Sequence, residues 1–164
     1  MINTYNESSL HKTLKILIAE EHASKTEVKL DGYICDVVTF YTSMKRGDFC
    51  DVFEIQTQNL GKLLSKITHL QKKHNVCLVH PISIETYIET YSENGEKLSC
   101  RKSPKKKDVY NLFDELTGIW SLINTCKNNK NSNVLGHFKL EIVETKIIKI
   151  KIKTKEPVQL TNKS

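Results

Sequence analysis

This chain of 164 residues has no apolar run that approaches the roughly 20 residues needed to cross a bilayer. The sequence therefore argues against a helical membrane protein, and we expect no membrane partner. Its first residues lack a basic region followed by an apolar one, so we expect no secretory signal. Its five cysteines form no CxxC pair, which makes a zinc site unexpected. A reducing, cytoplasmic location fits this use of cysteine.

Aromatic residues are also scarce, at 7 % of the chain. A basic surface interleaved with aromatics is typical of modules that stack nucleic-acid bases, and its absence argues against an RRM-like or OB-like domain. The net charge of +6 permits a polyanionic partner. An AT-rich genome that encodes lysine at solvated positions explains the same charge, so both alternatives stay open. Hydrophobic residues at 38 % and charged residues at 27 % suit one globular domain with its own core.

The hydrophobic periodicity predicts a mixed arrangement of helices and strands in the first half of the chain. A turn at Asp31-Gly32 predicts that the strands on either side of it form a hairpin. A near-continuous apolar run then predicts a buried strand that follows a helical crossover. The predicted elements, in chain order, are a helix at 6–21, strands at 26–30, 33–41 and 49–57, a helix at 60–74 and a strand at 75–82.

From residue 84 the chain changes character. Two strands, 86–91 and 97–101, flank the hairpin signal Asn94-Gly95. A helix at 108–123 follows, with Phe113 and Trp120 among the side chains expected to face inward. The alternation at 137–153 predicts one or two long strands. We expect a domain at 1–145, with a C-terminal strand and a frayed tail at 146–164.

Two acidic residues interrupt apolar strand patterns. Asp36 and Glu54 are 18 positions apart on consecutive predicted strands, so they could meet at one end of a sheet and share a divalent cation. A buried carboxylate is costly unless something pairs with it. Gln56 lies two residues after Glu54 and projects from the same face of a strand. The alternative is that each carboxylate pairs with a lysine elsewhere or ends a strand in water.

The pattern of Asp, a spacer and Glu-x-Gln resembles the PD-(D/E)xK phosphodiesterase site, with Gln in place of the usual Lys. The chain also resembles, over about residues 5 to 145, a family of uncharacterised prokaryotic proteins with a restriction-endonuclease-like core. That resemblance implies an α/β fold (an α+β mixed sheet) with an αβββαβ core, followed by a hairpin, a helix and long strands. The segments that carry it are residues 6–11, 31–36, 54–59, 78–82 and 101–105.

The resemblance also implies a site and a cofactor. Asp36, Glu54 and Gln56 would be catalytic, and Mg²⁺ or Mn²⁺ would bind to Glu7, Asp36, Glu54 and the carbonyl of Ile55. Glu7 has a second interpretation, as a carboxylate that complements the dipole of the first helix. Gln56 can bond to a water molecule but adds no positive charge, so it is open whether the change marks a weakened or lost activity.

Several basic residues are candidates for contact with nucleic acid. Lysine positions phosphates and does not read bases, so these residues predict no sequence specificity. A solvated charge run is the alternative. The leading hypothesis is a Mg²⁺-dependent nuclease that acts on DNA. The other is a non-catalytic protein of the same fold that binds nucleic acid or a protein partner; the oligomeric state, homodimer included, stays open. The basic candidates are Lys62, Lys66, Arg101, Lys102, Lys105, Lys106 and Lys107.

Overall fold

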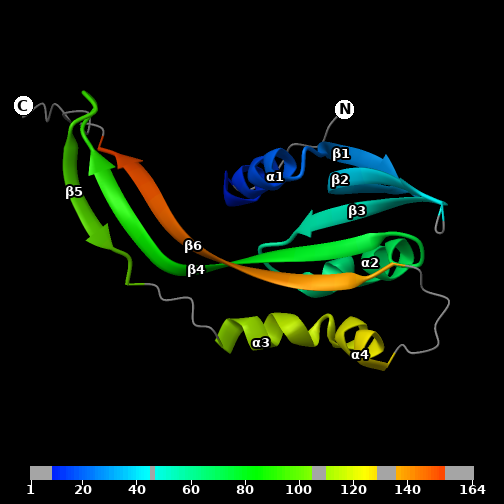
Figure 1. The fold of residues 1–164 in the computed structure, drawn as a ribbon. Helices are drawn as coiled ribbons and strands as arrows, with labels where there is room; N and C mark the ends of the chain where they lie inside the picture. Colours follow the sequence, from blue (N-terminus) through cyan, green and yellow to red (C-terminus); the bar gives the residue numbers. More distant parts are fainter. Residues whose placement is uncertain (1–8, 45–46, 105–109, 129–135, 154–164) are drawn as a thin grey trace, which may run out of the picture. The chain divides into compact units, whose positions relative to one another are not determined.

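The structure is a computed structural model that describes residues 9–44, 47–104, 110–128 and 136–153. This part of the chain is a mixed α+β fold with six strands and four α-helices (Figure 1). Its elements are α1 (Ser9–Glu21), β1 (Lys25–Leu30), β2 (Tyr33–Ser43), β3 (Gly47–Ile55), the 3₁₀ helix η1 (Leu60–Leu63), α2 (Leu64–Leu70), β4 (Asn75–Tyr91), β5 (Lys97–Lys102), α3 (Tyr110–Thr117), α4 (Trp120–Asn128) and β6 (Phe138–Ile152).

The first four strands form a mixed sheet in chain order. Strands β1, β2 and β3 are antiparallel neighbours, and β4 runs parallel to β3. Asp31 and Gly32 both have positive φ, 47° and 87°, as a tight hairpin turn requires, so the predicted hairpin is confirmed. The parallel pair needs a crossover, and η1 with α2 supplies it.

Strand β4 is longer than the sequence pattern predicted. The strands expected at 75–82 and 86–91 are one element, whose first part pairs with β3 and whose last part pairs with β5. Backbone bonds from Val76 N to His137 O and from Lys153 N to Tyr91 O join β6 to β4 in parallel. The chain divides into two compact units: Met1–Ile82 with Asp108–Val143, and Ser83–Lys107 with Glu144–Ser164. Strands β4 and β6 contribute to both.

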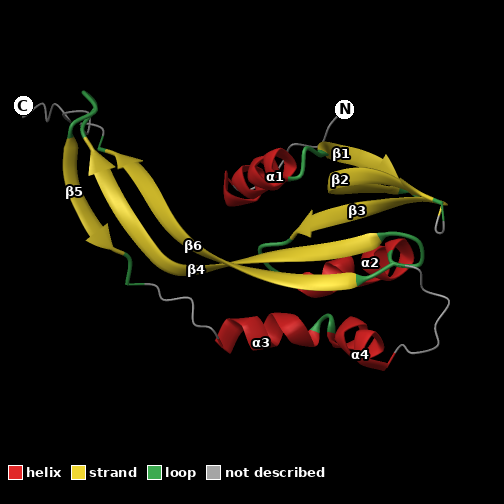
Figure 2. Cartoon of the chain, viewed as in Figure 1, coloured by secondary structure: helices red, strands yellow, loops and turns green. Residues whose placement is uncertain are grey.

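The core of the first unit has two apolar clusters, one on each face of the sheet. Alternate residues of β4 divide between them, as a strand requires, because successive side chains point to opposite faces. Helix α1 covers one face through Leu14, and the other face is covered by η1, α2 and α4 (Figure 2). The α1 cluster contains Leu14, Ile55, Cys77 and Val79. The larger α2 cluster contains Cys35, Val38, Cys50, Val52, Leu60, Ile67, Leu70, Val76, Leu78, Ile119 and Leu122.

The helix predicted at 108–123 is two helices, and the prediction that Phe113 and Trp120 face inward is wrong. These side chains are 60 % and 56 % exposed, whereas Ile119 is fully buried. The cause is a break at Gly118, whose backbone packs against Gly61. A Cβ at Gly118 would lie 2.9 Å from the Gly61 N atom. One helix ends before Gly118 and the next begins after it, so a single helical stripe does not describe this segment.

The helices of the described residues are short. The predicted helix at 60–74 begins as a 3₁₀ turn and ends at Leu70, and α1 begins at Ser9 within the described range. No helix in this part of the chain is both long enough and apolar enough to span a membrane. The predicted tail at 154–164 lies outside the described residues.

Candidate functional site

The backbone ladder between β2 and β3 ends just before the two predicted acidic residues. Its last pair is Val37 with Phe53. Beyond that pair, the Ile55 N–H donates to Asp36 Oδ2 at 2.9 Å, so a side chain takes the place of a backbone partner. Ile55 also pairs in parallel with Val79 of β4. Asp36 therefore lies at a fork, the point where β3 leaves β2 and continues beside β4.

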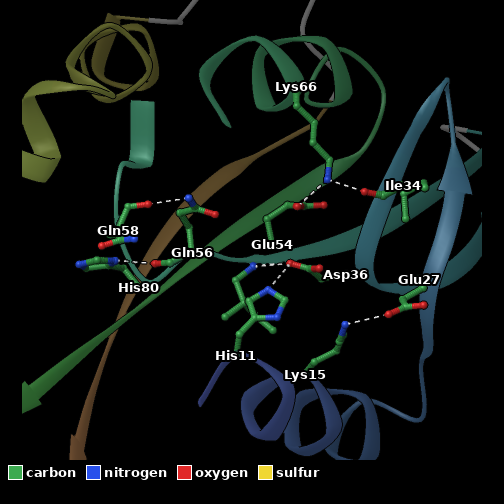
Figure 3. Close-up of polar contacts among 11 residues, drawn as sticks. His11, Lys15, Glu27, Ile34, Asp36, Glu54, Gln56, Gln58, Lys66 and His80 are labelled. Atoms are coloured by element: carbon green, nitrogen blue, oxygen red, sulfur yellow. Dashed lines mark hydrogen bonds and ion pairs between the residues drawn. The ribbon is translucent and has the colours of Figure 1, made fainter. Parts of the chain in front are cut away.

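Helix α1 brings His11 to this fork. His11 Nε2 lies 3.2 Å from Asp36 Oδ2, and the two side chains are 19 % and 22 % exposed (Figure 3). Burial pushes the pKa of Asp36 upward. Hydrogen bonds from His11 and the Ile55 N–H, with the charges of His11 and Lys66, outweigh burial and hold that pKa below its ordinary value of 3.8. Asp36 is therefore an ionised carboxylate at neutral pH.

Glu54 belongs to the α2 face of the sheet, because it follows Val52 by two residues on β3. Its Oε2 lies 2.6 Å from Lys66 Nζ, and the side chains of Glu54 and Lys66 are 3 % and 13 % exposed. Lys66 also donates to the Ile34 carbonyl at 2.6 Å (Figure 3). The second oxygen of Glu54, Oε1, is buried and accepts no hydrogen bond from the described residues.

The electrostatics of this pair are unfavourable to the ionised carboxylate. Burial raises the pKa of Glu54 above its ordinary value of 4.5, and the negative charge of Asp36 adds to the rise. The charge of Lys66 and the backbone N–H of Asp36 oppose it. Burial also raises the pKa of the neighbouring Cys35 thiol to about 12, so Cys35 stays protonated and is unsuited to nucleophilic attack or metal binding at neutral pH.

Gln56 follows the end of β3. The Gln56 side-chain Nε2 donates to the Gln58 backbone carbonyl at 2.5 Å. The backbone carbonyl of Gln56 accepts from His80 Nδ1 at 2.6 Å (Figure 3). A carbonyl only accepts, so Nδ1 of His80 carries a proton. That the Gln56 amide joins the two carboxylates stays a prediction; in the structure this amide is bonded to the loop after β3.

A second ion pair, with a buried lysine and an exposed carboxylate, lies on the α1 side. Lys15, one turn after His11, places its Nζ 3.0 Å from Glu27 Oε1 of β1, and Lys15 itself is only 7 % exposed. Residues four apart on a helix share a face, so α1 presents an imidazole and an ammonium to the sheet. Their spacing of four residues is the signal that sequence reasoning missed.

The donor set at the fork suits a hard cation. Asp36 and Glu54 offer carboxylate oxygens of the kind that Mg²⁺ and Mn²⁺ prefer. Ile55 follows Glu54 on β3, and its N–H bonds to Asp36. Glu7, the third predicted carboxylate, lies outside the described residues. Within the described ranges, no group of three or more His, Cys, Asp or Glu side chains is arranged to hold a metal ion. Glu54 has instead the lysine partner that the alternative interpretation expected.

The predicted basic residues do not share one setting. Lys62 is exposed on η1, whereas Lys66 is turned toward Glu54. On β5, Lys102 bonds to Glu85 at 2.7 Å, and Arg101 pairs with Ile88 on the opposite face of the strand. The remaining basic residues of the run, Lys105, Lys106 and Lys107, lie outside the described residues.

Comparison with known proteins gives a family but no activity. A protein of Treponema pallidum (strain Nichols), described as an uncharacterized protein, is 34 % identical over 122 residues. Those residues are 74 % of this chain and 45 % of that relative, so the chain spans less than half of the relative's length. No solved structure matches the chain significantly. The family model described as "Domain of unknown function (DUF8091)" matches residues 8–163, and the chain therefore belongs to that family.

Proposed function

We propose that this protein is a Mg²⁺- or Mn²⁺-dependent phosphodiesterase with a restriction-endonuclease-like core, and that it hydrolyses DNA. One observation carries the proposal. At the fork between β2 and β3, Asp36 is held ionised, and Glu54 is buried with one oxygen that no described residue bonds. One or two carboxylates, together with water and substrate phosphate, commonly bind Mg²⁺, and two consecutive strands supply two here.

The topology supports the same proposal. A helix, three antiparallel strands, a crossover helix and a strand parallel to the third follow one another, which is the αβββαβ order of the PD-(D/E)xK core. In that arrangement the Asp comes from the second strand and the Glu from the third, as Asp36 and Glu54 do here. The order of the elements and the strand positions of the two acidic residues therefore support the same family of folds, although they depend on different residues.

The proposal rests on the oxygen ligands at the fork, which are of the type that a divalent cation takes. Asp36, Glu54 and the Ile55 carbonyl would hold it, with Glu7 as a further ligand. Such an ion polarises a phosphate and lowers the pKa of a bound water, so that hydroxide is available at neutral pH. Glu54 Oε1 can meet a cation without losing a protein hydrogen bond, because it has none in the described structure.

The other polar residues have supporting roles in this proposal. Asp36 keeps its charge because His11 and the Ile55 N–H favour the ionised form. Gln56 orients water through its amide once that amide leaves Gln58. Lys62 contacts the DNA backbone from η1. Of the hairpin residues and the run that follows, Arg101, Lys102, Lys105, Lys106 and Lys107 add sequence-independent phosphate contacts.

The direct test is cleavage. Purified protein is incubated with supercoiled, linear, single-stranded and branched DNA, and with RNA, in Mg²⁺ or Mn²⁺. We expect DNA cleavage that Asp36→Ala abolishes, because the change removes a metal ligand. Asp48→Asn is the matched control: it removes one exposed carboxylate from the start of the same strand as Glu54, and it should cleave like the wild type.

The second candidate is a non-catalytic nuclease-fold protein that binds nucleic acid or a protein partner. The observation in its favour is that Lys66 already neutralises Glu54, while the Gln56 amide is engaged elsewhere. DNA binding without cleavage of any substrate, together with no Mn²⁺ binding at millimolar concentration, would favour this candidate over the enzyme.

A further inference from the structure

The Lys66 side chain is in an unusual place for a lysine. It leaves α2 and reaches the sheet, where its ammonium bonds to Glu54 Oε2 and to the Ile34 carbonyl, each at 2.6 Å. Only 13 % of the side chain is exposed. Its neighbour one turn earlier, Lys62, is exposed to water in the usual way. A lysine has three N–H donors, and these two bonds leave one proton available.

The fold gains little from this arrangement. An ion pair removed from water contributes weakly to stability, since the desolvation of both ions offsets their attraction. Ile34, whose carbonyl accepts the second bond, is 70 % exposed, so this bond anchors no core residue. The neighbours of Glu54 on the same face are apolar, and an apolar side chain at position 54 would pack against Val52 and Leu78 at lower cost. Ionisable groups that are buried beside a specific charged partner, without a benefit to folding, are typical of functional sites.

None of the other described polar groups near the fork places a permanent positive charge within bonding distance of Asp36 or Glu54. Gln56 is neutral and bonds to Gln58. His11 bonds to Asp36 and is charged only when protonated. Lys15 bonds to Glu27 on the neighbouring strand. Among the described residues, Lys66 is therefore the permanent cation placed within bonding distance of one of the two candidate metal ligands.

We propose that Lys66 is the catalytic cation of this site, and that its ammonium binds a non-bridging oxygen of the scissile phosphate beside the metal held by Asp36 and Glu54. The inference rests on the proposed function. Hydrolysis forms a bond from the oxygen of water to phosphorus and breaks the ester bond; one proton of the water ends on the leaving oxygen and the other stays with the new phosphate. Negative charge on the phosphate oxygens grows as the new bond forms, and a fixed ammonium stabilises it.

The position of Lys66 explains how a chain with Gln56 can still supply a positive charge. The charge comes from α2 across the sheet face and not from the strand that carries Glu54. In this proposal a divalent cation would share the Glu54 carboxylate with the Lys66 ammonium. The bond to the Ile34 carbonyl would keep the ammonium in place, and its remaining N–H would be available to a phosphate oxygen.

The experiment compares four variants on the DNA substrate that the wild type cleaves best. Lys66→Gln should lower kcat by about 10²- to 10³-fold, the range for loss of one preorganised donor, with Mn²⁺ affinity retained. Gln56→Lys in the Lys66→Gln protein should recover at least about tenfold of that loss, because it returns an ammonium to the same face. Lys72→Gln is the matched control, an exposed lysine just after α2, and should be unchanged. Mn²⁺ affinity is read by electron paramagnetic resonance.

The fourth variant, Lys66→Arg, covers the case in which Lys66→Gln does not fold. Arg keeps the charge, so the protein should fold and bind Mn²⁺; a planar guanidinium cannot place a point charge at the same position, so kcat should fall about tenfold. A folded Lys66→Gln protein at the wild-type rate, or faster, overturns the inference. So does a rate loss matched by lost Mn²⁺ affinity, or wild-type cleavage by Lys66→Arg beside an unfolded Lys66→Gln protein. Cleavage that needs Asp36 and ignores Lys66 removes this inference alone, whereas no cleavage by the wild type removes the proposed function with it.

Discussion

Removing one partner of the Glu54–Lys66 pair should cost the fold more than removing both. Lys66→Met leaves the Glu54 carboxylate at 3 % exposure with no counter-ion, and Glu54 Oε1 already accepts no hydrogen bond from the described residues. Loss of one partner of a buried pair costs about 3 to 5 kcal/mol. Because 13 % of the Lys66 side chain remains exposed, we expect the lower end, about 3 kcal/mol. That is a large part of the roughly 5 to 15 kcal/mol that holds a domain folded.

The double variant Glu54→Leu/Lys66→Met should differ little from the wild type. Apolar side chains in place of both ions are often neutral or stabilising by about 1 to 4 kcal/mol. Leu at position 54 would face Val52 and Leu78 in the α2 cluster. The two single changes and the double change form a cycle whose coupling energy measures the pair directly.

Urea unfolding followed by circular dichroism at pH 7 measures each free energy of unfolding, provided that the slopes stay alike. The pH dependence gives a second check. The pKa of Glu54 is raised by burial above 4.5, so its contribution to stability is fully present below the unfolded pKa and is lost as pH rises through the folded pKa. The cost of Lys66→Met should therefore shrink below about pH 4.5, where Glu54 is neutral in both states. A cost under about 1 kcal/mol at pH 7 would refute the reasoning, because solvated pairs behave that way.

Three further changes have defined outcomes. Asp36→Asn should destabilise the fold at pH 7, and its cost should fall below pH 3.8. The pKa of Asp36 is lowered in the folded state, so its contribution to stability is present above the unfolded pKa and is lost as pH falls through the folded pKa. An equal cost at pH 7 and pH 3 would contradict this. Gly136→Ala should destabilise by about 1 to 3 kcal/mol or more in urea unfolding, since its Cβ would lie 1.7 Å from the His74 carbonyl. Replacing Lys105, Lys106 and Lys107 with Gln should weaken DNA binding for all sequences and lower the salt slope by about 0.9 per lost contact, read by fluorescence anisotropy; an unchanged slope would make the run a solvated loop.

The part of the fold that local patterns control could be predicted. Asp31-Gly32 specifies a hairpin because both residues tolerate positive φ, and the apolar run of β4 specifies a strand with both faces covered. These signals depend on near neighbours in the sequence. They gave the order of helices and strands as far as β4, with ends displaced by a few residues.

Long-range packing decided the features that the sequence did not reveal. The break at Gly118 lies where its backbone packs against Gly61, 57 residues earlier, and no local signal at Ile119 or Trp120 indicates that contact. The same holds for the site. Asp36 and Glu54 were identifiable as acids inside apolar strands, but the helix residues that bond to them become neighbours only in the folded sheet.

The ion pair on the α2 face marks the candidate site by an argument that does not depend on any ligand. Val52 and Leu78 show that this face is otherwise built from apolar side chains. Burial on this face raises the pKa of Glu54, and the charge of Lys66, which is itself largely buried, opposes that rise. Two desolvated charges contribute less than two apolar residues would, so the needs of folding alone do not account for them. Local choices that conflict with the rest of a fold concentrate at functional sites. Glu54 with Lys66 is such a conflict, and it lies at the fork where Asp36 adds the second carboxylate.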